Sequence, residues 1–208
     1  MKAFTVVKGA APYLSRANID TDVIIRIERL TTLTRDMLGA YAMEALRFHE
    51  DGGVNTEFAL NRPEFRDAPI LLAGENFGCG SSREGAVWAL QGIGIRCIIA
   101  PSFGDIFFSN CFQNGVLPIR LTTAQIETLA IASAGGQTMT VDLPEQKILS
   151  PSGEEILFVV DPTRRESLLK GLDDIALTLQ DDTLIRQWQR ADRLSRPWAW
   201  PNKEVVIS

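Results

Sequence analysis

Short apolar runs and longer helical periods alternate along this chain and predict its first elements. Apolar runs over 3–8 and 23–27 indicate two short strands, separated by a polar turn rich in Asn and Asp. After Thr34, a favourable N-cap residue, apolar positions recur at helical spacing and predict an amphipathic helix that ends near the DGG at 51–53. The polar, proline-interrupted stretch 54–68 predicts a loop.

The centre of the chain has the clearest pattern. Residues 69–73, PILLA, are an apolar run typical of a buried strand, and the glycine-rich turn GENFGCGSS follows them. A helix is expected over about 83–93, and a second apolar run, RCIIA, covers 96–100. Strand, turn, helix and strand within about 30 residues predict a βαβ unit. The helix has an apolar stripe that we expect to be core: Ala86, Ala89, Leu90 and Ile93.

The second half of the chain continues to alternate between helix and strand. The expected elements are a helix over 104–114, a strand over 116–119, a helix over 123–133 and two or three strands within 138–160. Thr163 and Glu166 have capping-box spacing, which predicts a helix that starts there and stops at Gly171. Another helix is expected to begin near Asp181 or Asp182, and an extended tail follows it.

No linker-like stretch or internal repeat divides the chain, so we expect residues 1–208 to form a single domain. Its predicted class is α/β, with a mixed sheet and flanking helices, and a helical and extended tail is expected from about residue 183. The 45% hydrophobic and 23% charged residues exclude a disordered, collagen-like or coiled-coil chain. A chain of this length can bury a core without a disulfide or a metal.

Charge and cysteine content exclude several classes of function. The formal net charge is −5 and the charges are interspersed, which argues against a nucleic-acid-binding surface. Cys79, Cys97 and Cys111 are accompanied by one histidine, His49, which we expect at the surface; this set fits neither a disulfide framework nor a self-contained zinc or iron–sulfur site. The chain shows no 18-residue apolar stretch and no signal-peptide pattern, so we expect no membrane association and a cytoplasmic location.

The turn from Gly74 to Ser82 is the strongest candidate for chemistry. Its glycines let backbone amides approach a ligand closely, and the helix that follows begins with unpaired N–H donors. Together with Arg83, these features predict an anion site for a carboxylate or a phosphate. The turn does not match GxGxxG, and no GKS or GKT follows it, so nucleotide sites are weakly supported.

The serines of this turn also have a purely structural reading. Ser81 and Glu84 have the spacing of a capping box, and Ser82 is equally suited to be the N-cap residue. From the residues alone, both the structural and the functional reading stay open.

Three other features have two readings each. Cys79 is either a reactive thiol near a helix N-terminus or a small packing residue, and we favour packing. Asp20 and Asp22 are either a metal pair or turn caps, and the residues alone favour caps. Trp198 and Trp200 indicate either a partner surface or packing back onto the domain.

Several sequence blocks, taken together, resemble a known family. The block ENFGCGSSRE is followed by a Trp-Ala-Leu, by IIAPSFGDIFFSN and by GVLP, and NIDTDVII and GLDDIALTLQ lie before and after them. This series resembles the isopropylmalate dehydratase small subunits, the swivel-domain partners of the aconitase superfamily. The resemblance extends to about Asp182 and implies a swivelling β/β/α domain of aconitase type.

The resemblance implies a hydro-lyase that is active only as a complex. Such a chain isomerises 2- and 3-isopropylmalate in leucine biosynthesis, by dehydration and rehydration of a small diacid. The four-iron, four-sulfur cluster is expected on a separate large subunit, in a heterodimer or heterotetramer, so this chain is expected to bind no cofactor itself.

The resemblance also implies roles for five residues of this chain. Ser81 matches the serine that takes a proton from carbon as an alkoxide, and Arg83 matches an arginine that binds a substrate carboxylate. Ser82 matches a serine that helps to form the pocket, and Asp22 matches an aspartate that supports a histidine of the partner subunit. Arg35 falls near a further carboxylate-binding arginine, across a gap.

Three positions depart from the family pattern. Arg26 follows the DTDVII block where proline is usual, Gly85 stands where histidine follows SSRE, and Val87 stands in place of a proline. The segment near 26–35 is thought to shape the pocket for the substrate's side group, so Arg26 and the charges after it indicate a more polar substrate or simply face solvent or the partner. Gly85 costs about 1 kcal/mol of helix stability relative to Ala, which suggests that it makes room for something.

Two alternative functions follow from these departures and from the anion turn. The first is the small subunit of a paralogous hydratase for a smaller diacid, of the citraconate, methylmalate or dimethylmaleate type. The second is a non-catalytic module that binds an anionic metabolite or another protein.

Overall fold

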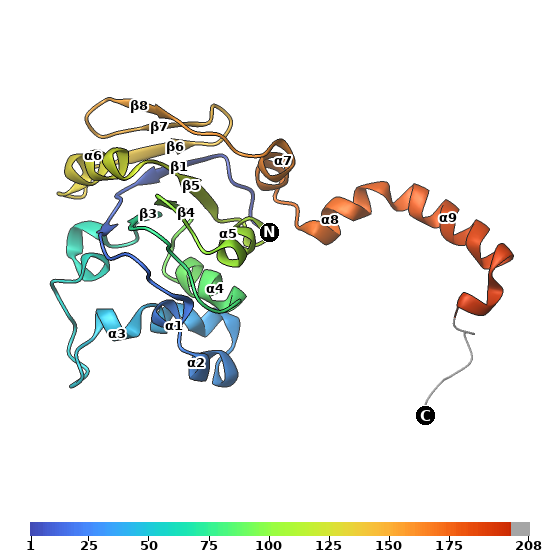
Figure 1. Ribbon diagram of the computed structural model, residues 1–208, viewed down its shortest axis with the longest axis horizontal. Helices are drawn as coiled ribbons and strands as arrows, with labels where there is room; N and C mark the ends of the chain where they lie inside the picture. Colours follow the sequence, from blue (N-terminus) through green and yellow to red (C-terminus); the bar gives the residue numbers. More distant parts are fainter. Residues whose placement is uncertain (201–208) are drawn as a thin grey trace. The chain divides into compact units, whose positions relative to one another are not determined.

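Two compact units make up the chain in the computed structural model, which describes residues 1–200. Unit 1 covers residues 1–171 and contains both sheets, and unit 2 begins at Leu172 and is helical where it is described (Figure 1). The expectation of a single domain over 1–208 stays a prediction.

Unit 1 contains two four-stranded sheets that differ in the direction of their strands. One is antiparallel in the order β1-β6-β7-β8, and the other is parallel in the order β2-β3-β4-β5. The strands are β1 Val6–Gly9, β2 Tyr13–Leu14, β3 Ile70–Ala73, β4 Cys97–Ala100, β5 Leu117–Arg120, β6 Met139–Asp142, β7 Lys147–Leu149 and β8 Glu155–Leu157. The α/β class with flanking helices is therefore confirmed, with the strands divided between two sheets.

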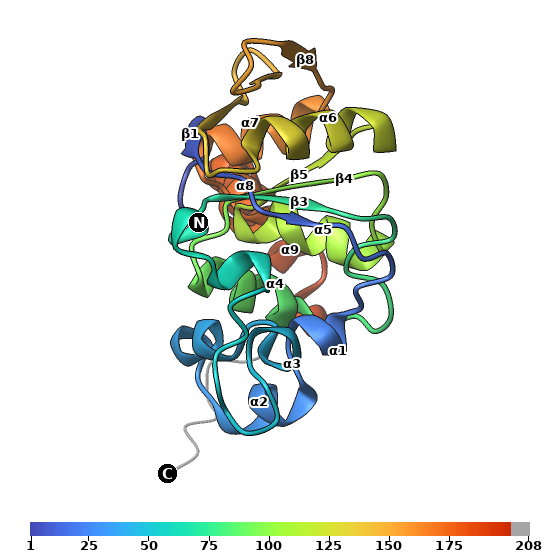
Figure 2. The same ribbon diagram turned by 90° about the vertical axis from the view of Figure 1, so that its left-hand side faces the viewer.

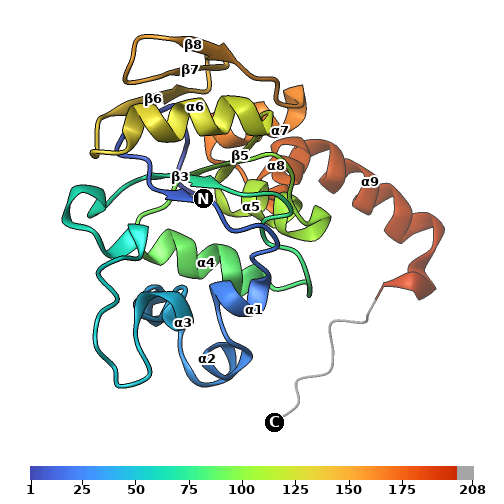
Figure 3. The ribbon, with the colours of Figure 1, turned by 60° about the vertical axis from the view of Figure 1, so that its left-hand side comes forward.

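The helices of unit 1 form layers around the parallel sheet. They are α1 Thr21–Ile24, α2 Ile27–Thr32, the 3₁₀-helix η1 Arg35–Tyr41, α3 Glu44–Arg47, the 3₁₀-helices η2 Ala59–Asn61 and η3 Pro63–Phe65, α4 Glu84–Gly92, α5 Asp105–Asn114, α6 Thr123–Ser133 and α7 Pro162–Lys170. Helices α4 and α5 lie on one face of the parallel sheet, and α6 and the antiparallel sheet lie beyond the other (Figure 2). Helices α1, α2 and α3 form an outer layer against α4 (Figure 3).

The central strands are buried on both faces, and their alternate residues enter two different cores. In β3, Leu71 and Ala73 pack in the core with α4 and α1, whereas Ile70 and Leu72 pack in the core with α6 and the antiparallel sheet. This division follows from the period of two along a strand. It explains why β3 reads as a continuous apolar run.

The central and later elements lie where the sequence predicts them. Strands β3 and β4 flank α4 as parallel neighbours, and α5, β5 and α6 follow in the expected order. The expected stripe of α4 is core: Ala86, Ala89 and Leu90 are buried, and Ile93 packs against the same cluster. The strands within 138–160 are three, with the turn between β7 and β8 at 150–153.

The expected strand over 23–27 is wrong, because this segment forms the end of α1 and the start of α2. The side chain of Asp20 accepts a hydrogen bond from the backbone N of Val23 (2.8 Å) and caps α1. The local cap therefore overrides the β-branched run. Asp20 is thus a helix cap, as one of the two sequence readings proposes.

The expected long helix after Thr34 is also wrong, because it is broken into η1 and α3. Met43 between them has a left-handed φ of 53°. The Thr34 side chain caps nothing and instead contacts Asp36 (2.6 Å). Backbone packing explains the irregular path, since a Cβ on Gly39 would lie 2.6 Å from the carbonyl carbon of Gly92 in α4.

Two details near the C-terminal end differ from expectation. Helix α7 is capped by Asp161, which accepts from the backbone N of Arg164 (3.1 Å), rather than by a capping box at Thr163. Unit 2 contains α8 Asp174–Thr178, the 3₁₀-helix η4 Leu179–Asp181, α9 Asp182–Ser195 and the 3₁₀-helix η5 Pro197–Ala199. The expected extended tail is therefore helical at η5, and its remainder after residue 200 lies outside the described residues.

Candidate functional site

The glycine-rich turn after β3 is held in place by main-chain hydrogen bonds on two sides. The backbone N of Gly78 donates to the carbonyl of Ile19 (2.7 Å), and the backbone N of Phe77 donates to that of Ser102 (3.1 Å). Gly78 and Gly80 have left-handed φ values of 71° and 89°. A Cβ on Gly78 would also lie 2.2 Å from the ring of Phe107, so both conformation and packing require glycine there.

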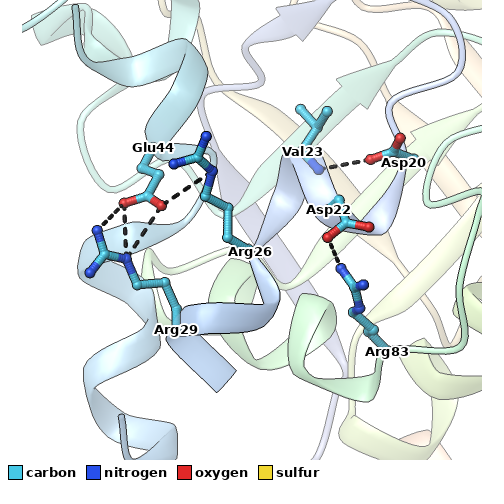
Figure 4. A network of polar contacts seen from close by, with 7 residues as sticks. All are labelled: Asp20, Asp22, Val23, Arg26, Arg29, Glu44 and Arg83. Carbon is cyan, nitrogen blue, oxygen red and sulfur yellow. Dashed lines mark hydrogen bonds and ion pairs between the residues drawn. The ribbon is translucent and has the colours of Figure 1, made fainter. Parts of the chain in front are cut away.

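The short helix α1 lies beside this turn, and its first residues face it (Figure 4). Asp20 pairs with Cys79 in an isolated parallel bridge, and the backbone N of Thr21 donates to the Cys79 carbonyl (3.0 Å). Residues about 60 positions apart in sequence are therefore joined through their backbones. The three residues of the block DTD then have separate tasks, because Asp20 caps α1 while Thr21 and Asp22 contact the turn.

Ser81 is exposed at the end of the turn, and its contact is with Thr21. The hydroxyl oxygens Ser81 Oγ and Thr21 Oγ1 are 3.2 Å apart, and Thr21 Oγ1 also donates to the Ser81 carbonyl (3.0 Å). Thr21 is 1% exposed. The Ser81 hydroxyl thus contacts a buried hydroxyl, while Ser81 as a residue is exposed to solvent.

Arg83 joins the two segments by an ion pair with Asp22 (Figure 4). Its side chain is 19% exposed and that of Asp22 is 55% exposed. Arg83 is also the N-cap residue of α4, with no side-chain cap, and its backbone N donates to the Ser81 carbonyl (2.9 Å). Ser82 between them is exposed.

The capping-box reading of Ser81 and Glu84 is wrong. The α4 cap carries no side-chain hydrogen bond, and Glu84 Oε1 instead accepts from Asn114 Nδ2 (2.8 Å). The Ser81 hydroxyl is therefore not used to satisfy the helix terminus. The anion-site reading of the turn stays a prediction, with Asp22, Ser81, Ser82 and Arg83 brought together at one place.

Arg35 has a different environment from these four residues. Its Nη2 donates to Gln91 Oε1 (3.2 Å) and Asn114 Oδ1 (3.2 Å), and its guanidinium carbon lies 4.8 Å from the centre of the Trp88 ring. These partners belong to α4 beyond its first turn and to the end of α5. A substrate-binding role for Arg35 stays a prediction.

Arg26 and Arg29, in the same segment as Arg35, share one carboxylate partner. Arg29 Nη2 lies 2.9 Å from Glu44 Oε2, and Arg26 Nε lies 3.8 Å from Glu44 Oε1 (Figure 4). The Arg29 guanidinium also stacks on Tyr41, at 4.1 Å from the ring centre. The hydrogen bond with Glu44 raises the pKa of Arg29. Their positive charges are therefore partly neutralised within the chain.

Gly85 makes room for Leu30. A Cβ on Gly85 would lie 2.3 Å from a methyl carbon of the Leu30 side chain, and Gly85 is buried in the first turn of α4. Val87, the third departure, is a fully buried core residue. The glycine thus lets α2 pack closely on the helix that carries the candidate site.

The described residues 1–200 show no ligand set for an iron–sulfur cluster, and the expectation that this chain binds no cofactor stays a prediction. Within residues 1–200, no group of three or more His, Cys, Asp or Glu side chains is placed to hold a metal ion. Burial raises the pKa of Cys97 and of Cys111, and both thiols lie in the hydrophobic cores of unit 1. Across the same residues, no helix has the length and apolar character needed to cross a membrane.

Comparison with known proteins identifies the family. The Aconitase C-terminal domain model matches residues 1–124, and the LeuD_N model matches residues 129–162. A 3-isopropylmalate dehydratase small subunit from Rhodospirillum centenum is 51% identical over 96% of this chain and 99% of its own length. The chain belongs to the 3-isopropylmalate dehydratase small-subunit family.

Other members agree with this assignment. The small subunit from Rhodospirillum rubrum is 50% identical over 95% of this chain and 97% of its own length. A crystal structure of 3-isopropylmalate dehydratase from Methanocaldococcus jannaschii is 29% identical, with a TM-score of 0.64 over 88% of this chain and 99% of that chain. The predicted family and its aconitase-type fold class are confirmed. The similarity covers more of the chain than the recognised blocks, which end near Asp182.

Sequence reasoning missed Thr21. The only sequence signal for Thr21 is its place between the two aspartates of the block NIDTD. Its contact with Ser81 joins positions 60 residues apart, and no local period reports such a contact. The structure therefore adds one buried hydroxyl to the candidate site.

Proposed function

We propose that this chain is the small subunit of 3-isopropylmalate dehydratase, a hydro-lyase that interconverts 2- and 3-isopropylmalate in leucine biosynthesis. The observation that carries the proposal is the group formed by Asp22 of α1 with Ser81 and Arg83 at the end of the backbone-tethered turn, in a chain 51% identical to a named small subunit. Neither the smaller-diacid alternative nor the binding-module alternative has an observation in its favour.

Ser81 is proposed to move the proton. Dehydration removes a proton from the carbon next to a carboxylate and hydroxide from the neighbouring carbon, which leaves a double bond between them. Rehydration then adds hydroxide to the carbon that lost the proton and a proton to the carbon that lost hydroxide, so that H and OH exchange places. A serine hydroxyl is too weak an acid to act as a base without help. The N-terminus of α4 and the guanidinium of Arg83 supply positive potential beside Ser81, which favours its alkoxide.

Arg83 is proposed to hold the substrate carboxylate next to the carbon that loses the proton. Negative charge grows on that carboxylate during proton removal, and a guanidinium can hold it with two parallel hydrogen bonds. Arg83 is paired with Asp22 in this chain, so substrate must share or replace that contact. Ser82, exposed between Ser81 and Arg83, is proposed to complete the pocket.

The remaining parts of the reaction are proposed to come from a large subunit. Its four-iron, four-sulfur cluster would supply the Lewis acid for the departing hydroxyl. Asp22 is proposed to support a histidine of that subunit, in a heterodimer or heterotetramer. Arg35 would bind a second carboxylate only if it left Gln91 and Asn114. A cytoplasmic location stays a prediction.

The test is anaerobic copurification with a cluster-bearing large subunit, followed by assays of each chain alone and of the complex. We expect activity on 2- and 3-isopropylmalate from the complex only, and loss of at least about 100-fold in a Ser81→Ala complex. An active Ser81→Ala complex would contradict the role of Ser81. A higher kcat/KM for methylmalate than for isopropylmalate would favour the smaller-diacid alternative, and tight metabolite binding without turnover would favour the binding module.

A further inference from the structure

Thr21 is the most buried polar side chain beside the exposed Ser81, and both its contacts are with that residue. Thr21 Oγ1 lies 3.0 Å from the Ser81 carbonyl oxygen and 3.2 Å from Ser81 Oγ. Thr21 is 1% exposed, so water does not substitute for these contacts. The role of this contact therefore depends on which of the two hydroxyl oxygens donates the hydrogen bond.

The direction of these hydrogen bonds depends on the charge of Ser81. A threonine hydroxyl has one proton and two acceptor positions. While Ser81 is neutral, Thr21 donates to the Ser81 carbonyl, and the Ser81 hydroxyl donates to Thr21 Oγ1. Once Ser81 is an alkoxide it has no proton to give, so the contact survives only if Thr21 donates to it.

This reversal leaves no buried group unpaired. The Ser81 carbonyl also accepts from the backbone N of Arg83 (2.9 Å), so it keeps a donor when Thr21 turns away. The backbone of Thr21 is fixed on both sides, because its N donates to the Cys79 carbonyl (3.0 Å) and its O accepts from the N of Ile25 (2.9 Å). Only the hydroxyl hydrogen of Thr21 has to move, by rotation about the Cβ–Oγ1 bond.

We propose that Thr21 is a positioning residue that stabilises the alkoxide of Ser81. Its hydroxyl turns from donating a hydrogen bond to the Ser81 carbonyl to donating one to Ser81 Oγ. No covalent bond of Thr21 forms or breaks, and its proton stays on Thr21 Oγ1 throughout. A hydrogen bond to a charged oxygen is stronger than one to a neutral oxygen, so the contact favours ionised Ser81. The inference rests on the proposed function, which assigns the alkoxide to Ser81.

The titratable groups around this pair are the ion-paired Asp22 and Arg83, Asp20 and Cys79 in the adjoining bridge, and Glu84 in the first turn of α4. Each acts on the pKa of Ser81 whether or not Thr21 carries a hydroxyl. Variants that change only the Thr21 hydroxyl therefore isolate its effect.

The first experiment uses the full chain without partner or substrate. Ser81→Cys places a titratable thiol at the site, and its alkylation rate against pH, followed by tandem mass spectrometry to separate it from Cys79, gives its pKa. We expect Thr21→Val in this background to raise that pKa and lower the thiolate fraction near pH 7 roughly tenfold. Thr21→Ser should restore it, and Thr128→Val, an exposed hydroxyl on α6, should leave it unchanged.

The second experiment uses the complex with the large subunit. Thr21→Val should lower kcat by about 10- to 100-fold with KM nearly unchanged, and should shift the acidic limb of the pH profile to higher pH. Thr21→Ser should recover most of kcat. Thr21→Ala serves as a second hydroxyl-free variant if the valine variant does not fold.

These readouts separate the inference from the function on which it rests. Equal thiol pKa values with and without the Thr21 hydroxyl would overturn the inference, and so would a hydroxyl-free complex with unchanged kcat and pH profile. An active Ser81→Ala complex would instead overturn the role of Ser81, whatever the thiol titration gives.

Discussion

Two regions of unit 1 place arginines beside carboxylates, and they hold them in different ways. At the turn after β3, backbone hydrogen bonds fix the chain, and the exposed groups of Asp22 and Ser81 stay accessible. At Glu44, whose side chain is 15% exposed, the carboxylate is paired with both Arg26 and Arg29. A site needs its chain fixed and its functional groups available, so the first region is suited to chemistry and the second to structure.

Replacing Gly78 should break the first region most severely. Gly78→Ala combines a φ of 71° with a Cβ 2.2 Å from the Phe107 ring, and we expect a loss of about 3–5 kcal/mol in the free energy of unfolding. Urea unfolding measures it. Gly153→Ala is the matched control, because its φ is 89° and no atom lies within 4 Å of the added Cβ. Equal losses in the two variants would show that Phe107 packing is unimportant.

Removing the guanidinium should separate activity from stability. Arg83→Gln is expected to lower kcat/KM of the complex by about 100-fold or more, because the substrate carboxylate loses its charged partner. Stability should change by less than about 1 kcal/mol, since the partner Asp22 is more than half exposed. Steady-state kinetics and thermal unfolding measure both. A Glu44→Gln complex provides the comparison, with kcat/KM expected near that of the unmodified complex.

The buried thiols of Cys97 and Cys111 should make the free energy of unfolding fall at alkaline pH. Burial raises the pKa of Cys97 and Cys111 in the folded chain, whereas unfolded thiols ionise near about pH 8.5. Their contribution is therefore complete below that pH and falls as pH rises, by about 1.4 kcal/mol per thiol per pH unit. Urea unfolding from pH 7 to 10 measures the slope. Cys97→Ala should reduce it, and an unchanged slope would contradict this account.

The contact of Gly85 with Leu30 should behave as a packed pair. Gly85→Ala is expected to cost about 1–3 kcal/mol through crowding of Leu30, despite the better helix propensity of alanine. In a Leu30→Ala background the same change should become neutral or stabilising, and a double-mutant cycle measures the coupling. Additive effects would show that crowding of Leu30 does not cause the loss of stability in Gly85→Ala.

The smallest expected effect belongs to the second region. Glu44→Gln leaves Arg26 and Arg29 without their carboxylate and should cost about 1 kcal/mol or less, because both arginines are partly exposed. Salt should weaken the effect, and unfolding at low and high ionic strength measures this. Glu28→Gln on α2 is the control, with a smaller expected change.

The sequence predicts those parts of the fold that local pattern decides. Helix α4 and strands β3 and β4 follow from an apolar period and from glycines between them. The segment 23–27 was mispredicted because one capping hydrogen bond from Asp20 outweighs a β-branched run. This bond joins residues three positions apart, so Asp20 itself was the local signal for a helix start.

At the candidate site, the limit is set by contacts between distant segments. Ser81 and Arg83 are found from the sequence because the glycine turn and the family blocks contain them. The role of Thr21 and the reason for Gly85 are not, because each depends on a contact across the fold, with Ser81 and with Leu30 respectively. The burial of one partner and the exposure of the other become visible only in three dimensions.

The bridge between Asp20 and Cys79 is made by peptide groups, which every amino acid possesses. Substitution of side chains therefore cannot remove the bonds that align these two segments, unless proline is introduced. Positions 30 and 85, by contrast, depend on the size of each other's side chain. A lineage with this architecture can consequently exchange side chains around the turn while α1 and the turn stay aligned.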